Sequence, residues 1–97
     1  ITIIMKKKVL FVFEFGKRTP SQVSKINREL FGYVDQSFHG KYTYHRKGLL
    51  SDFDVNRIAK GAFITDVVND KKILQILHGM GTKKIKRYFL TVDKIIG

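Results

Sequence analysis

The apolar pattern of the chain begins with a dense run at residues 9–15, VLFVFEF, which is interrupted only by Glu14. A run that is apolar on both faces is typical of a central β-strand. Similar patterns predict a second buried strand at residues 62–68 and a further strand, with a basic beginning, at residues 85–92. Residues 41–47, KYTYHRK, alternate like a strand but have no aliphatic face, so we expect them to form an edge strand.

Two segments between these strands carry apolar residues at helical spacing. Residues 19–32, TPSQVSKINRELFG, place Thr19 and Gln22 at the spacing of a capping box, with proline at the first helical position. Residues 70–78 show a second apolar helical face, and Asp70 stands where an N-terminal cap is expected. The pattern therefore predicts two helices.

The predicted order is strand, helix, strand, strand, helix, strand. This order is that of the ferredoxin-like split βαβ fold: an α+β domain with a four-stranded antiparallel sheet and two helices on one face. The right-handed crossover rule places the first and third strands at the centre. Residues 49–60 stay open between helical turns and an ordered loop. We expect one domain, 1–97, in which residues 1–8 form either its beginning or a flexible or non-native extension.

The chain has a formal net charge of +11, from 19 Lys and Arg against eight Asp and Glu. A folded domain with this excess attracts polyanions, and we expect a nucleic acid, RNA or DNA, as its partner. The alternative is a lysine-rich surface that only maintains solubility. The absence of cysteine excludes disulfides and thiolate metal sites. No apolar run is long enough to span a bilayer, so we expect a cytoplasmic protein without membrane contact.

Residues 41–47 are the strongest candidate site. Tyr42 and Tyr44 offer rings for stacking on bases, each worth about 1–3 kcal/mol, while their basic neighbours suit phosphates. No acid occurs from residue 36 to residue 51, whereas protection of a sheet edge would tolerate acids as well. RNA or other single strands are favoured, because stacking needs unpaired bases.

Two further basic clusters extend this hypothesis. Residues 83–87 follow a predicted helix end, where the helix dipole also favours cations. Residues 17–18 precede the first helix, whose amide groups suit a phosphate, although a solvated turn explains them better. The predicted nucleic-acid-binding residues are Lys17, Arg18, Lys41, Tyr42, Tyr44, His45, Arg46, Lys47, Lys83, Lys84, Lys86 and Arg87.

Two other function classes remain open. A small ferredoxin-like nuclease would use Glu14, His39 and His45, with Asp35 nearby in sequence. The sequence contains no metal-binding histidine spacing and no nucleotide-binding fingerprint, so we expect no cofactor and no bound metal. A protein-interaction or sensor module would instead form a homodimer through the open sheet face, and homodimerisation is also compatible with nucleic-acid binding.

Overall fold

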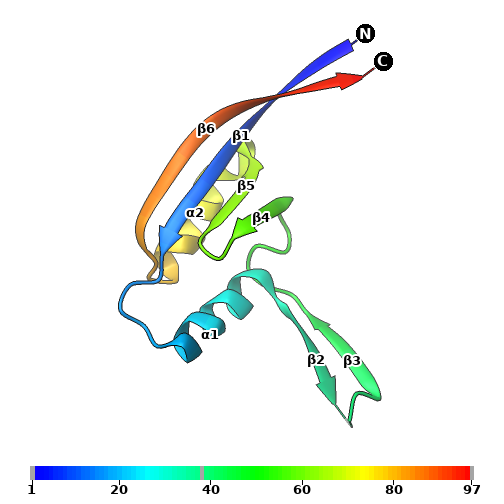
Figure 1. Cartoon of the computed structure of the whole chain (residues 1–97), viewed down its shortest axis with the longest axis vertical. Helices are drawn as coiled ribbons and strands as arrows, with labels where there is room; N and C mark the ends of the chain where they lie inside the picture. Colours follow the sequence, from blue (N-terminus) through cyan, green and yellow to red (C-terminus); the bar gives the residue numbers. More distant parts are fainter. Residues whose placement is uncertain (1, 38, 97) are drawn as a thin grey trace. The chain divides into compact units, whose positions relative to one another are not determined.

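A computed structural model of the chain describes residues 2–37 and 39–96 (Figure 1). Its elements are, in chain order, β1 (Thr2–Glu14), α1 (Pro20–Phe31), β2 (Tyr33–Ser37), β3 (Tyr42–Arg46), β4 (Val55–Ala59), β5 (Ala62–Asp66), the short 3-10 helix η1 (Val67–Asn69), α2 (Asp70–Gly79) and β6 (Lys83–Ile96). They form two compact units. The hairpin unit comprises Lys17–Asp52, and the sheet unit comprises the chain before and after it. Within the described residues, neither helix has the length and apolar character needed to cross a bilayer.

The sheet unit contains a four-stranded antiparallel sheet with the strand order β4-β5-β1-β6. The predicted α+β class, with such a sheet and two helices, is confirmed. The two most apolar strands, β1 and β5, are the inner pair. Apolar residues on both faces suit an inner strand, because both faces are removed from water there.

The edge strand of the sheet differs from the prediction. Residues 42–46, expected at this edge, form β3, which pairs with β2 in a separate two-stranded sheet. The edge position belongs to β4, in the segment 49–60. The prediction of helical turns or a loop for that segment is therefore wrong for residues 55–59. β3 has no apolar face to bury, whereas β4 brings Val55 opposite the buried Thr65. Val55 is the one residue of β4 that is partly buried, and the other four are exposed, so pairing with β5 more than burial of apolar surface places β4 at the edge.

Strands β1 and β6 are longer than the apolar runs that predict them. Residues 2–7 pair with residues 91–96 beyond the end of β5, so the two strands continue as a two-stranded ribbon (Figure 1). Residues 2–8 therefore belong to β1. Lysines interrupt the apolar pattern here, and the backbone pairing of β1 with β6 is not readable from either strand alone.

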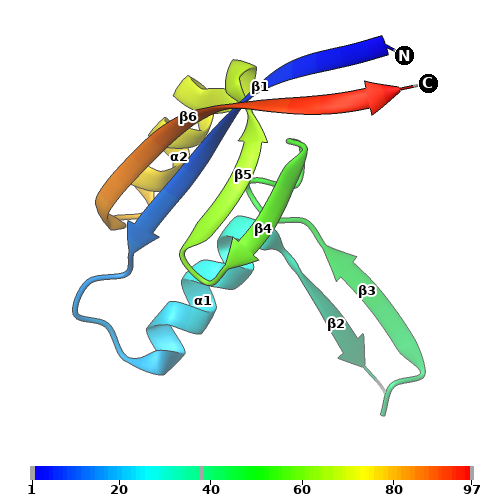
Figure 2. The same cartoon turned by 45° about the horizontal axis from the view of Figure 1, so that its top comes forward.

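The core of the sheet unit lies between the sheet and α2. Val9, Phe11 and Phe63 are 0% exposed, and the rings of Phe11 and Phe63 stack at 5.2 Å. Helix α2 covers this face of the sheet with the buried side chains of Ile73 and Leu77 (Figure 2). Helix α2 thus matches the predicted apolar face at residues 70–78.

Asp70 has a different role from the predicted cap. The N-cap of α2 is Asn69, and no side-chain hydrogen bond caps this end. The carboxylate of Asp70 instead accepts a hydrogen bond from Arg87 Nη1 at 2.6 Å, while its Oδ1 is buried without a partner among the described residues. Asp70 therefore ties the start of α2 to β6, which is a tertiary contact that the local sequence does not reveal.

In the hairpin unit, the predicted capping box of α1 is confirmed. Gln22 N donates to Thr19 Oγ1 at 3.2 Å, and Thr19 N donates to Gln22 Oε1 at 2.9 Å. The helix ends at Gly32, which has a φ of 78°. This left-handed conformation is the one that favours glycine at a helix end.

The end of α1 is fixed to the segment that follows β3. The amides of Leu49 and Leu50 donate to the carbonyl groups of Glu29 and Leu30, each at 2.8 Å. These bonds satisfy carbonyl groups that a helix C-terminus leaves unpaired. A Cβ on Gly48 would lie 2.3 Å from Leu30 O, so the two segments approach each other as closely as glycine allows. The hairpin base and the helix end are thereby held together.

Candidate nucleic-acid interface

The β2–β3 hairpin gathers three tyrosines on one of its faces. In the pairing register Tyr33 lies opposite Arg46, Asp35 opposite Tyr44, and Ser37 opposite Tyr42. Opposed residues share a face, as do residues two positions apart. The three tyrosine side chains therefore project to the same side, and they are 42–47% exposed.

Each of these tyrosines has a cation close to its ring. The Arg28 guanidinium lies 5.2 Å from the ring centre of Tyr33, Lys41 Nζ lies 5.7 Å from that of Tyr42, and the Arg46 guanidinium lies 5.6 Å from that of Tyr44. These distances are within the range of about 6 Å for a cation–π contact. We call these six side chains the tyrosine face: Tyr33, Tyr42, Tyr44, Arg28, Lys41 and Arg46.

One acid interrupts the positive charge of the tyrosine face. Asp35 Oδ2 lies 3.5 Å from Arg46 Nη2, and both side chains are about half exposed. A surface pair at this distance contributes about 0–1 kcal/mol to stability. Its role is therefore to orient the Arg46 guanidinium beside Tyr44 more than to hold the fold.

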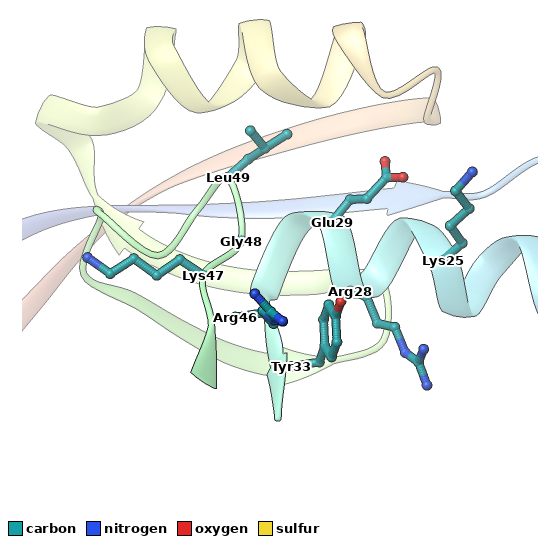
Figure 3. A pocket seen from close by; sticks show the side chains of 8 residues that line it. All are labelled: Lys25, Arg28, Glu29, Tyr33, Arg46, Lys47, Gly48 and Leu49. Carbon is teal, nitrogen blue, oxygen red and sulfur yellow. The ribbon is translucent and has the colours of Figure 1, made fainter. Parts of the chain in front are cut away.

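An open pocket of about 690 Å³ lies at the base of the tyrosine face (Figure 3). In the close view, the Tyr33 ring stands between the side chains of Arg46 and Arg28. Cations dominate the described residues that line it, with one acid, one aromatic ring and one exposed leucine. The lining consists of Lys25, Arg28, Glu29, Tyr33, Arg46, Lys47, Gly48 and Leu49.

Five of the predicted binding residues come together at this surface: Lys41, Tyr42, Tyr44 and Arg46 in the hairpin, and Lys47 in the pocket. His45 does not, because it lies opposite Val34 on the other face of the hairpin. Lys17 and Arg18 precede the N-cap of α1, at the helix end away from the pocket. A 12-residue helix is about 18 Å long, so these two cations form a separate cluster.

The other predicted cations, Lys83, Lys84, Lys86 and Arg87, belong to the sheet unit. Arg87 donates to the largely buried Asp70 at 2.6 Å, and Lys84 Nζ lies 3.6 Å from Glu14 Oε2. Lys86 lies opposite Val12, on the sheet face opposite Arg87. The four residues alternate across β6 and do not form one patch. Arg87 serves the fold directly through its ion pair.

The residues considered for a nuclease are also distributed. Glu14 belongs to the sheet unit, whereas His39 and His45 belong to the hairpin unit. His39 occupies the hairpin turn with a φ of 56°, and His45 lies on the face opposite the tyrosines. In the described part of the chain, no group of three or more His, Asp or Glu side chains is arranged to hold a metal ion.

Tyr33, Arg28 and Lys25 lie at this surface although their sequence positions did not predict it. The alternating segment 33–37, YVDQS, directly after the glycine that ends α1, was the signal for a strand that pairs with residues 42–46. That pairing brings Tyr33 beside Arg46, and helical geometry then brings Arg28 and Lys25 to the same place.

Comparison of the chain with protein-family models, with curated proteins and with solved structures finds no match.

Proposed function

We propose that this protein binds single-stranded nucleic acid, with RNA favoured, through the tyrosine face. One observation carries the proposal: three half-exposed tyrosines share one hairpin face, and each has an Arg or Lys within 6 Å of its ring. Rings stack on bases and cations neutralise phosphates, which are the two contacts that single-strand binders combine. The overall charge of +11 strengthens the attraction to any polyanion.

The spacing of the rings favours an unstacked strand. Tyr42 and Tyr44 are two residues apart on β3, which places them about 7 Å apart along the hairpin at roughly 3.4 Å per residue. Neighbouring bases of a duplex strand rise about 3.4 Å. Neighbouring bases therefore reach neighbouring rings only in an extended single strand. Stacking reads no base edge, so the binding should be weakly sequence-specific.

We further propose that the sheet unit follows the ferredoxin-like arrangement, with the β2–β3 hairpin inserted between the first helix and the second sheet strand. With the hairpin set aside, the strands β1, β4, β5 and β6 become the first to fourth of the sheet. Their order β4-β5-β1-β6 then supports this assignment, because it puts the first and third strands inside. A cytoplasmic location, where RNA is encountered, is part of the same proposal.

The test is fluorescence anisotropy of labelled single-stranded RNA, single-stranded DNA and duplex DNA, from about 50 to 200 mM salt. We expect binding of the single strands that weakens with salt, and weaker binding of the duplex. Tyr44→Ala should lower the affinity about tenfold, since one stacked base contributes about 1–3 kcal/mol. Thr43→Ala is the matched control, because Thr43 lies on the other hairpin face.

Equal losses of affinity in the two variants, or an affinity that does not change with salt concentration, would contradict the proposal. The same samples are then run on a denaturing gel. Cleavage of the RNA that disappears on replacing His39 or His45 would favour the nuclease alternative instead.

A second proposal concerns self-association through the sheet face opposite α2. By strand alternation this face carries Tyr88, Leu90 and Val92, which are 37–48% exposed. These three side chains form an apolar row along β6, with Lys8 and Lys6 opposite Leu90 and Val92 on β1. An exposed apolar row of this kind suits a second copy of the chain. Light scattering with size-exclusion chromatography should show a dimer that Leu90→Lys dissociates; a monomer at all concentrations would exclude it.

A further inference from the structure

The pocket at the base of the tyrosine face has a stronger charge than the hairpin above it. Lys25, Arg28, Arg46 and Lys47 contribute four positive charges, and Glu29 is the one acid among the described lining residues. Asp35, which lies 3.5 Å from Arg46, offsets one more charge. The pocket lining therefore keeps an excess of about two positive charges. Figure 3 shows the side chains of Arg28 and Arg46 beside the ring of Tyr33, whereas the ammonium groups of Lys25 and Lys47 point away from it.

This excess matches a phosphate monoester better than a phosphodiester. An internal phosphate of a nucleic acid carries one negative charge, whereas a monoester carries about 1.5–2 near neutral pH. Guanidinium groups bind phosphate oxygens through paired hydrogen bonds, and the pocket offers two of them, from Arg28 and Arg46. The half-exposed side chain of Leu49 adds an apolar contact suited to a sugar or the edge of a base.

The pocket also lies at one end of the row of tyrosines. Tyr42 is next to the hairpin turn, Tyr44 follows, and Tyr33 is opposite Arg46 at the base, where it lines the pocket. A strand whose bases stack along this row would reach the pocket with the nucleotide bound at Tyr33. A volume of about 690 Å³ exceeds what a phosphate alone needs and leaves room for that nucleotide.

We propose that the pocket binds the terminal phosphate monoester of a single strand whose adjoining bases stack on the tyrosine face. The proposal rests on the proposed function and adds to it a defined ligand chemistry, a phosphorylated strand end. It assigns the guanidinium groups of Arg28 and Arg46, which lie on either side of Tyr33 in Figure 3, to the terminal phosphate, and Tyr33 to the terminal base.

The test uses one labelled single-stranded RNA in three forms: with a 5′-phosphate, with a 3′-phosphate, and with neither. We expect at least one phosphorylated form to bind about tenfold more tightly than the form with neither, as for an added charge-assisted hydrogen bond. Tighter binding of the 5′-phosphate or of the 3′-phosphate would support the proposal and would set the direction of the strand. Equal gains for both would support it with either direction allowed.

Two variants separate the pocket from general charge. Arg28→Gln, at an exposed pocket position beside Tyr33, should bring the ratio of phosphorylated to unphosphorylated affinity close to one. Lys41→Gln, beside Tyr42 near the turn, should weaken all three RNAs while keeping that ratio. Equal affinities of the unchanged protein for all three RNAs would overturn the pocket proposal but leave single-strand binding intact. Absence of binding by all three would overturn both.

Discussion

The sheet unit and the hairpin unit are both built on antiparallel strands, but they differ in how many of their strand side chains are exposed to solvent. In the sheet unit, Val9, Phe11 and Phe63 are 0% exposed and form a core against α2. In the hairpin unit, every residue of β3 is exposed. A two-stranded hairpin gains little stability in water from its own pairing, so burial does not explain the residues of β3, whereas the proposed binding of a nucleic acid would.

The two units also use their cations differently. In the sheet unit, Lys8 and Arg87 form ion pairs of 2.6 Å with Asp66 and Asp70. In the hairpin unit, cations lie 5.2–5.7 Å from tyrosine rings, and the ion pair of Arg46 with Asp35 is longer, at 3.5 Å. Arg87 of the sheet unit also lies 5.7 Å from a ring, that of Phe89, but its short bond to Asp70 engages its guanidinium. A cation in a short bond to a carboxylate offers less to a phosphate, so a net charge of +11 does not show which cations are available to a ligand.

The largest expected effect tests the core of the sheet unit. Phe11→Ala should lower the free energy of unfolding by about 3–5 kcal/mol, because it removes a fully buried ring and leaves a cavity. Tyr44→Ala should change it by less than about 0.5 kcal/mol, as for an exposed position. Urea titrations followed by circular dichroism measure both. A similar decrease in the free energy of unfolding of the two variants would mean that the hairpin is part of the stabilising core.

The next effect tests how the hairpin base is held. Gly48→Ala should cost about 3 kcal/mol, since the new methyl group would meet backbone atoms of Leu30 and Gly32 at 2.3 Å. Gly79→Ala is the control, because a Cβ there meets nothing within 4 Å. We expect faster amide hydrogen exchange in the hairpin unit of Gly48→Ala. Unchanged exchange there would contradict the close approach of the two segments.

A pair of arginines sharpens the difference in the use of cations. Arg87→Ala should lower the free energy of unfolding by about 2 kcal/mol, because it leaves the largely buried Asp70 carboxylate without its donor. Arg46→Ala should cost at most about 1 kcal/mol, as for an exposed pair, but should weaken RNA binding. Thermal unfolding and anisotropy are measured on both variants. The reverse result, stability lost in Arg46→Ala and binding lost in Arg87→Ala alone, would refute the assignment.

The smallest effect concerns acid stability of the sheet unit. The hydrogen bond from Lys8 holds the pKa of Asp66 below its usual range, against a smaller opposing effect of desolvation. A carboxyl with a lowered pKa in the folded state stabilises the protein at neutral pH, and this contribution disappears as the pH falls through that pKa. In Asp66→Asn, the free energy of unfolding should therefore fall less between neutral and acid pH than in the unchanged protein, as measured by urea unfolding. Asp52→Asn, at an exposed position of the hairpin unit, is the control; an equal change there would contradict the role of the Lys8 bond.

Local sequence patterns predicted the elements that depend on local chemistry. The capping box of Thr19 and Gln22 and the apolar face of α2 are read from residues three or four positions apart. The inner strands β1 and β5 follow from continuous apolar runs. The pairing of β3 with β2 was not predicted, because the weak alternation of residues 33–37 gives no apolar signal for a strand. The pairing of residues 33–37 with residues 42–46 depends on a chain reversal near Gly40.

The candidate site was predicted in part for the same reason. Tyr42, Tyr44 and their basic neighbours are contiguous in sequence and were found together. Tyr33 and Arg28 reach them only through the hairpin register and through the position of the α1 end. Asp70 and Arg87 show the opposite case. From the local sequence, Asp70 suits a helix cap and Arg87 suits a binding site, but the fold joins the two side chains in an ion pair.

The most direct test of the account follows the four tyrosine rings of the chain by NMR, using ring-labelled tyrosine and a single-stranded RNA titrated at low salt. Three of the rings belong to the tyrosine face, and Tyr88, in the sheet unit and 48% exposed, is an internal reference. Stacking on bases predicts ring-current shifts at Tyr33, Tyr42 and Tyr44, with little change at Tyr88. Binding that shifts Tyr88 and leaves the three hairpin rings unchanged would contradict the central claim.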